Sequence, residues 1–233
     1  MSLAQYDCSA NRGKCLQACR RGYIVKDEET GQELKIDNKY VMSPSDLCTI
    51  GQIDKIIDSG VSVFKIEGRG RSEDYVYTVV KCYKEAVESY YNKTYNQKKI
   101  IEWVSKLESV YNRGFWHGGY YLGKETGEWS GKYGSQAKKE RFFIGVVKHY
   151  FPKKEIAVVE LESGELKIGD SIQITGKTTG IIESVIQEIW LDDKKVKKAV
   201  KGDVITIKTK EKVRDKDKLY VVIDRKNWQG EKK

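Results

Sequence analysis

The spacing of apolar residues changes near Phe142, and this change constrains the fold more than any other feature of the chain. Up to residue 137, apolar residues recur mainly at helical spacing. From Phe142 onward, short runs alternate between apolar and polar residues and are separated by turn residues. These runs predict strands at 142–150, 155–161, 170–175, 180–190, 203–208 and 218–223. We therefore expect two domains, 1–137 and 138–233, the second of them a small antiparallel β-barrel.

The first domain is expected to alternate between helices and strands. Its expected elements are a hairpin within 22–41, a helix from Ser43 to Gly60, a buried strand at 61–66, a helix from Ser72 to Tyr90 and a helix from Gln97 to Val110. This order is typical of an α/β fold, but one strand cannot form a parallel sheet by itself. The rest of that sheet is expected to come from elsewhere. The glycine-rich stretch 113–137 then forms a linker or a substrate-facing loop.

The chain has a formal charge of +9, and the basic excess lies in the second domain. Residues 138–233 hold 23 Lys and Arg against 16 Asp and Glu, whereas residues 1–137 hold 20 against 18. Such an excess suits RNA or another polyanion, and a solvated lysine-rich surface explains it equally well. Neither a long apolar run nor a signal peptide occurs, so we expect a soluble cytoplasmic protein with no membrane span.

Five cysteines without an export signal are expected to stay reduced, as free thiols or as metal ligands. Cys15 and Cys19 lie four positions apart, near enough to share a metal, and thiolates suit iron centres. The alternative for this pair is two buried structural thiols. Cys82 falls on an apolar helix face and is expected in a core.

The best active-site candidates follow the expected strand at 61–66, because barrel enzymes place catalytic groups at the carboxyl ends of their strands. Glu67 and Arg69 are the catalytic candidates, and Lys65 and Arg71 are candidates for binding substrate. Arginine offers a bidentate fork to carboxylates, so this cluster suits an acidic substrate. The alternative is an ion-pair network that seats the following helix.

Arg113 and Tyr120 place a cation and an aromatic ring on the glycine-rich stretch, which suits stacking on an unpaired base. The aromatic residues near them are Trp116, Tyr121 and Trp129. Packing between domains is the alternative explanation. His117 is either a general base or a surface imidazole. The sequence has no His-Glu-x-x-His zinc helix, no Gly-x-Ser-x-Gly elbow and no second carboxylate near Glu67, so it shows no peptidase motif.

Three segments together resemble the collagenase-like peptidases of family U32. They are Asn11–Arg20, Met42–Cys48 and Phe64–Arg69, with Asn112–Phe115 and Gly119–Gly123 similar to a fourth element of that family. The resemblance implies that residues 1–137 are the C-terminal portion of a TIM-like barrel. It also implies that the small β-barrel is similar to the second domain of elongation factor Tu. The family's N-terminal region is missing, so we expect a fragment or one half of a split enzyme.

The resemblance implies a cofactor as well. Members of the family are implicated in hydroxylating RNA bases or the ubiquinone ring, with an iron-sulfur cluster held by four cysteines. Cys15 and Cys19 match the cluster-binding pair, and Cys48 matches a further cysteine of some members. Some members that act on tRNA take the hydroxyl group from prephenate, an acidic molecule that Glu67 and its neighbouring guanidinium groups would bind.

We therefore expect an iron-sulfur-dependent hydroxylase of RNA, acting on the tRNA wobble uridine or on rRNA. The expected partners are tRNA or rRNA, together with a separate N-terminal half or a second copy of the chain. A collagenase-like peptidase, which the family name implies, and a non-catalytic fragment that binds RNA or a partner are the two alternatives.

Overall fold

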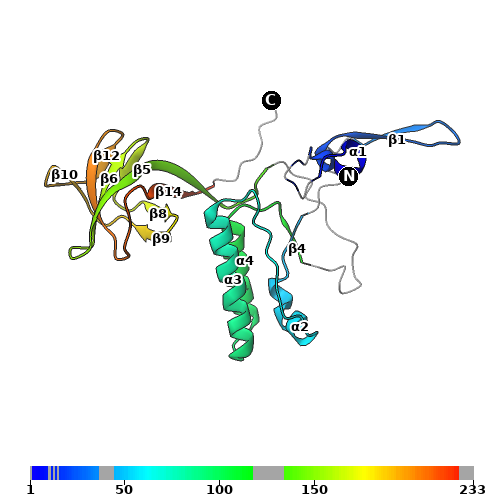
Figure 1. Cartoon of the computed structure of the whole chain (residues 1–233), viewed down its shortest axis with the longest axis horizontal. Helices are drawn as coiled ribbons and strands as arrows, with labels where there is room; N and C mark the ends of the chain where they lie inside the picture. The colour runs from blue at the N-terminus through cyan, green and yellow to red at the C-terminus, as the bar shows by residue number, and fades with distance from the viewer. Residues whose placement is uncertain are drawn as a thin grey trace. The chain divides into compact units, whose positions relative to one another are not determined.

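The computed structural model describes residues 2–9, 12, 14, 16–36, 45–117 and 134–225 (Figure 1). The chain divides into two compact units. The first unit comprises Met1–Lys65 and Cys82–Ala137, and the second comprises Ile66–Lys81 and Lys138–Lys233. The segment 66–81 therefore belongs with the β-rich half of the chain, although it lies far from that half in the sequence. No helix among the described residues is long and apolar enough to cross a membrane.

A β-hairpin follows two short helical segments in the first unit. The elements are α1 (Ser2–Tyr6), η2 (Ala18–Arg20), β1 (Tyr23–Lys26) and β2 (Glu33–Ile36). The two strands pair antiparallel, with Tyr23 opposite Ile36. The Asp27 carboxylate accepts hydrogen bonds from the backbone N–H groups of Glu29 and Thr30 and so shapes the turn. The expected hairpin within 22–41 is confirmed.

The helix expected from Ser43 begins later in the structure. The elements that follow the hairpin are β3 (Asp46–Leu47), η3 (Ile50–Gln52) and α2 (Ile53–Asp58). Ser43 and Pro44 lie outside the described residues, and β3 pairs in parallel with β4 (Phe115–Trp116). Asp46 is extended because its backbone N–H donates to Gly114 and its carboxylate binds Arg113. The helical expectation for residues 46–47 is therefore wrong.

Residues 61–66 do not form the expected buried strand. They have no regular secondary structure, and the Val63 side chain is 80% exposed. A parallel strand forms only where a neighbouring strand supplies its hydrogen bonds, and no strand of the described chain pairs with this segment. The portion of a TIM-like barrel is likewise not formed in the described part of the first unit, where the only parallel pairing joins β3 and β4.

Two amphipathic helices form a hairpin (Figure 1). They are α3 (Glu73–Tyr91) and α4 (Gln97–Ser109). Asn96 caps α4, because its side chain accepts a hydrogen bond from the backbone N–H three residues on. The Trp103 indole N–H donates to Glu85 at 2.9 Å, and its ring stacks on Tyr95. These contacts join α4 to α3, and both expected helices are confirmed.

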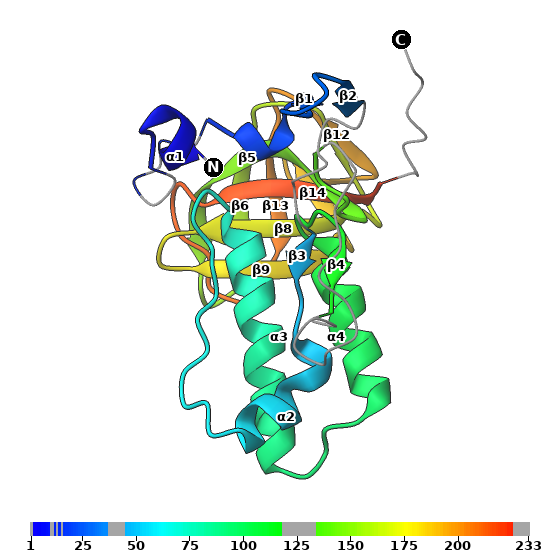
Figure 2. The same ribbon diagram turned by 90° about the vertical axis from the view of Figure 1, so that its right-hand side faces the viewer.

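An eight-stranded antiparallel sheet dominates the second unit (Figure 2). Its strands in spatial order are β11 (Lys194–Val196), β10 (Ile189–Leu191), β13 (Val204–Lys208), β6 (Ile156–Leu161), β5 (Lys139–Phe151), β14 (Lys218–Asp224), β8 (Ser171–Gly176) and β9 (Gly180–Val185). Every expected strand is present, with 180–190 divided into β9 and β10. The sequence did not predict β11 or the separate pair β7 (Glu165–Lys167) and β12 (Lys198–Val200).

The sheet does not close into the expected barrel. Its end strands β9 and β11 do not pair with each other anywhere in the described chain. The link between β9 and β10 is bound elsewhere, because the backbone N–H of Gly169 donates to Ile186 and the N–H of Ile186 donates to Asp170. The expectation of a closed barrel is therefore corrected to an open sheet accompanied by a two-stranded ladder.

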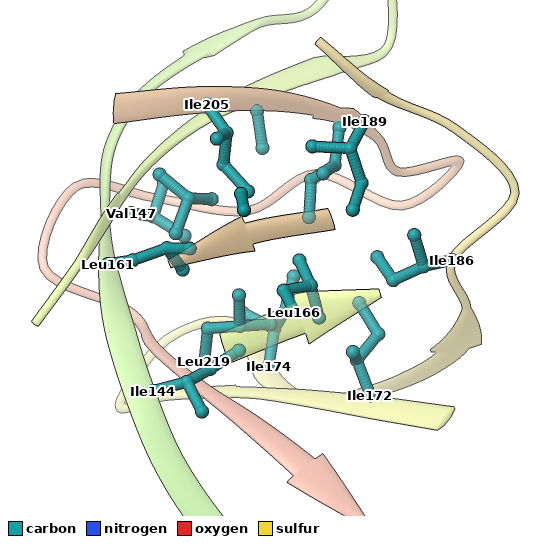
Figure 3. Close-up of a cluster of buried hydrophobic side chains, with 14 of the residues drawn as sticks. Ile144, Val147, Leu161, Leu166, Ile172, Ile174, Ile186, Ile189, Ile205 and Leu219 are labelled. Atoms are coloured by element: carbon teal, nitrogen blue, oxygen red, sulfur yellow. The ribbon is translucent and has the colours of Figure 1, made fainter. Parts of the chain in front are cut away.

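One cluster of buried aliphatic side chains fills the second unit. Figure 3 shows side chains from strands throughout the unit, among them Ile144, Leu161, Ile189 and Leu219, pointing toward one another. Leu166 of β7 joins this cluster, so the short ladder shares the core of the sheet. Burying each such side chain contributes about 1.5–3 kcal/mol to folding. Because alternate residues point inward, the outer face of the sheet carries its own set of side chains.

Candidate functional site

The candidate catalytic residues lie on a tight turn directly before α3. We call residues 66–71 the arginine loop. A carboxylate oxygen of Glu67 accepts a hydrogen bond from the backbone N–H of Arg69 at 2.9 Å. The backbone N–H of Arg71 donates to the carbonyl of Gly68 at 3.0 Å. These contacts fold the loop onto itself and fix where the Glu67 carboxylate lies.

The arginine loop presents both signs of charge to solvent. Glu67 and Arg69 are exposed, and Arg71 is half-buried with its guanidinium carbon 5.5 Å from the centre of the Tyr75 ring. Guanidinium groups beside a positioned carboxylate suit an anionic ligand with a proton to exchange. Lys65 is also exposed but belongs to the first unit. The structure thus brings together Glu67, Arg69 and Arg71.

Arg141 of β5 fastens the segment 66–81 to the sheet. Its Nη2 lies 2.9 Å from the Asp74 carboxylate, and its Nη1 donates to Gln173 Oε1 at 2.8 Å. The guanidinium carbon also lies 4.8 Å from the centre of the Tyr220 ring. Both charged side chains are largely buried, so salt screens this pair only weakly. The sequence analysis missed Arg141, and no local pattern around it signals the contact with Asp74.

Arg113 has a protein partner in the first unit. Its Nε and backbone N–H each lie 2.9 Å from a carboxylate oxygen of Asp46, and its Nη2 also donates to that carboxylate. The arrangement joins β3 to β4 and uses the guanidinium fork that the sequence analysis assigned to a substrate. Tyr120, the other candidate on the glycine-rich stretch, lies outside the described residues. The exposed ring of His117 lies edge-on to Phe115.

The cysteines of the described chain are not arranged as a cluster site. Cys48 is 3% exposed, and burial raises the pKa of its thiol, which keeps the proton on sulfur. Burial also raises the pKa of the neighbouring Tyr83 to about 12. Cys19 is half-buried, Cys82 is buried as expected, and Cys15 lies outside the described residues.

An iron-sulfur cluster needs several thiolates close together. Among the residues that the structure covers, no three or more His, Cys, Asp or Glu side chains gather closely enough to hold a metal ion. The described donor set therefore does not fit a cluster held by four cysteines. Ligation by Cys15, Cys19 and Cys48 stays a prediction.

Comparisons with known proteins give the family context. The model of Peptidase family U32 matches residues 1–131. A protein of Porphyromonas gingivalis named collagenase is 54% identical over 220 residues, which is 94% of this chain and 53% of that protein. A tRNA hydroxylation protein of Bacillus subtilis is 30% identical over 193 residues, which is 79% of this chain and 44% of that protein.

A third relative is named for rRNA. It is a 23S rRNA 5-hydroxycytidine synthase of Escherichia coli, 37% identical over 89 residues, which is 38% of this chain and 13% of that protein. The chain spans about half the length of the collagenase relative. The similarity to the tRNA relative extends over most of the chain, whereas the similarity to the rRNA relative extends over a much smaller part of it.

Proposed function

Because the chain belongs to Peptidase family U32, we propose that it acts on RNA, as part of an enzyme that hydroxylates a base of tRNA or rRNA. Two relatives carry names of that activity, one for tRNA and one for rRNA. The observation that carries the proposal is the place of the arginine loop. It belongs to the same compact unit as the β-sheet in which the basic excess of the chain lies. Phosphate groups are the natural partners of such a surface.

In this proposal each group of the arginine loop has one task. Arg69 and Arg71 bind phosphate oxygens of the RNA or the carboxylates of an acidic co-substrate such as prephenate. Glu67, held by the backbone N–H of Arg69, takes or returns a proton at the substrate. The contact between Arg141 and Asp74 keeps this loop on the sheet. An iron-sulfur cluster remains outside these steps, because the described residues do not supply its ligands.

A collagenase-like peptidase is the second candidate, and the 54% identity to a protein named collagenase favours it. Peptide hydrolysis needs an activated nucleophile or a metal-bound water. Both described histidines, His117 and His149, have an aromatic ring as their neighbour. Glu67 is positioned by backbone rather than by a second acid or a base. A non-catalytic fragment that binds RNA or a partner is the third candidate.

The test is made in cells that lack the protein and are complemented with variants. Mass spectrometry of digested RNA is expected to show a nucleoside that gains one oxygen atom only when the protein is present. Glu67→Gln and Arg69→Gln should each abolish or sharply reduce that nucleoside, whereas Lys98→Gln, on an exposed position of α4, should not. Unchanged RNA in all strains, with gelatin cleavage by the purified chain, would reject hydroxylation in favour of the peptidase.

A further inference from the structure

The outer face of the sheet carries an ordered group of aromatic and basic side chains. In β5, Tyr150 packs against the core, while its neighbours His149 and Phe151 are exposed. In β10, Ile189 is fully buried and Trp190 is only half-buried. The three rings therefore stand on the side of the sheet that faces away from the core. We call this surface the outer platform.

The register of the ladders places these rings in line. His149 lies opposite Val158 of β6, which lies opposite Thr206 of β13, which lies opposite Trp190 of β10. Lys195 of β11 continues this row. Neighbouring strands are about 4.8 Å apart, so His149 and Trp190, three strands apart, are separated by about 14 Å. A four-stranded sheet with aromatic side chains at such positions stacks two or three unpaired bases in known RNA-binding folds.

A bulge in β5 makes this row possible. The pairing of β5 with β6 shifts between Val147 and His149, which leaves Lys148 as the extra residue. Beyond the shift, Phe151 lies opposite Ile156, which lies opposite Lys208 of β13. The outer platform therefore has a second row of an aromatic ring, an aliphatic side chain and a lysine.

The rings remain accessible for stacking. Phe151 is 45% exposed, and its ring lies edge-on to His149 with the ring centres 4.5 Å apart. Trp190 has the ammonium group of Lys195 5.0 Å from its ring centre. Between these rings the surface is made of Val158 and Thr206, which are too short to cover them. A planar base has room to lie against either aromatic group.

Lysines on and around the outer platform supply positive charge. Lys195 and Lys208 lie 2.8 Å and 3.6 Å from the two carboxylate oxygens of Glu188, and Lys148 pairs with Glu160. The platform thus carries three lysines against two acids. Further exposed lysines stand at its rim, in the turn after β5 and after β13. They are Lys153, Lys154 and Lys210.

We propose that the outer platform seats a short stretch of unpaired RNA, with bases stacked on Trp190 and Phe151 and phosphates beside Lys195 and Lys208. This inference rests on the proposed function and names the part of the unit that holds the substrate. A peptide fits the surface less well, because the backbone groups of β6 and β13 are already used within the sheet and offer an extended chain no hydrogen bonds. Bases need only rings and nearby cations.

The experiment measures binding of a fluorescently labelled single-stranded RNA to the full chain by anisotropy. Trp190→Ala and Phe151→Leu should each weaken binding about tenfold. The matched control is Phe142→Leu, since Phe142 is 45% exposed on the same strand but about 30 Å from Phe151. Trp190→Phe should restore most of the affinity, and equal thermal unfolding midpoints would show that the variants fold. An RNA duplex should bind more weakly than the single strand.

Three results would overturn the inference or separate it from the proposed function. If the chain binds RNA and Trp190→Ala and Phe151→Leu bind as tightly as Phe142→Leu, the outer platform is wrong and the proposed function stands. If a labelled gelatin peptide binds in place of RNA and Trp190→Ala weakens it, both are wrong. If the platform variants lose RNA binding but cells show no hydroxylated nucleoside, the platform is right and the proposed chemistry is wrong.

Discussion

The carboxylate of Asp46 holds the guanidinium group and the backbone N–H of Arg113, a residue 67 positions later in the chain. Both side chains are about one-fifth exposed. This contact orders the chain on both sides of it, because the parallel pairing of β3 with β4 begins at Asp46 and Phe115. Arg113 is therefore a positioning residue of the first unit.

Replacing either partner should destabilise the first unit. Arg113→Ala leaves the Asp46 carboxylate without three donors, and we expect a loss of about 2 kcal/mol in the free energy of unfolding. Arg113→Lys should recover only part of this, because an ammonium group cannot reproduce the fork. Chemical denaturation of Asp46→Ala, Arg113→Ala and the double variant measures the coupling. Additive effects of the two single changes would contradict this role for the pair.

Gly176, the last residue of β8, leaves room for a buried carboxylate. Asp217 is 5% exposed and accepts hydrogen bonds from the Thr179 hydroxyl and the backbone N–H of Arg214. A Cβ atom at position 176 would overlap this carboxylate. Gly176→Ala should therefore destabilise the second unit by about 1–3 kcal/mol in urea unfolding. Gly22→Ala is the control, since a Cβ there meets no atom within 4 Å. Equal stabilities of the two variants would argue against the overlap.

The β7–β12 ladder should respond to acid through Glu165, which pairs with Lys167 and Lys198. Hydrogen bonds from Lys167 and then Lys198 lower the pKa of Glu165 from 4.5 to about 2. Because the folded pKa lies below the unfolded value, the resulting stability is present above pH 4.5 and is lost as the pH falls toward 2.

An NMR titration of the Glu165 carboxyl group measures this shift directly. Lys167→Gln should raise its pKa toward 4.5, and high salt should do the same in the wild type, because the pair is exposed and is screened. A pKa of Glu165 that does not change in Lys167→Gln would contradict the assignment to these lysines.

The cysteines should differ in reactivity toward alkylating agents. Cys48 and Cys82 are buried, while Cys8 and Cys19 are half-buried. The raised pKa of Cys48 also keeps its thiolate population low, and only the thiolate reacts. Mass spectrometry after timed alkylation should therefore find Cys8 and Cys19 labelled first, with Cys48 labelled only on unfolding. Labelling of Cys48 as fast as Cys19 would show that the first unit opens at Cys48.

The sequence predicts most of the strands of the second unit because alternation is a local signal. β7, β11 and β12 escape it, since three residues are too few to show a period. Val61–Ile66 has the composition of a strand, yet composition does not reveal whether a partner strand exists, and here none of the described strands pairs with it. The difference is one of tertiary pairing rather than of local preference.

The candidate site shows the same division. Glu67, Arg69 and Arg71 are close in sequence, so their proximity follows from the chain itself. The contact of Arg141 with Asp74 joins residues 67 positions apart, and no spacing rule reaches that far. The row from His149 to Trp190 depends on the bulge after Val147, and sequence alone does not fix that register.

The most direct test of the central claim is ultraviolet crosslinking of the protein to nucleic acid in living cells, followed by sequencing of the RNA that remains attached. If the chain acts on RNA, crosslinks should concentrate on one or a few tRNA or rRNA sites, and Arg69→Gln should reduce them strongly while Lys98→Gln leaves them unchanged. Crosslinks no more frequent than for an unrelated basic protein, together with gelatin hydrolysis by the same purified chain, would contradict the claim.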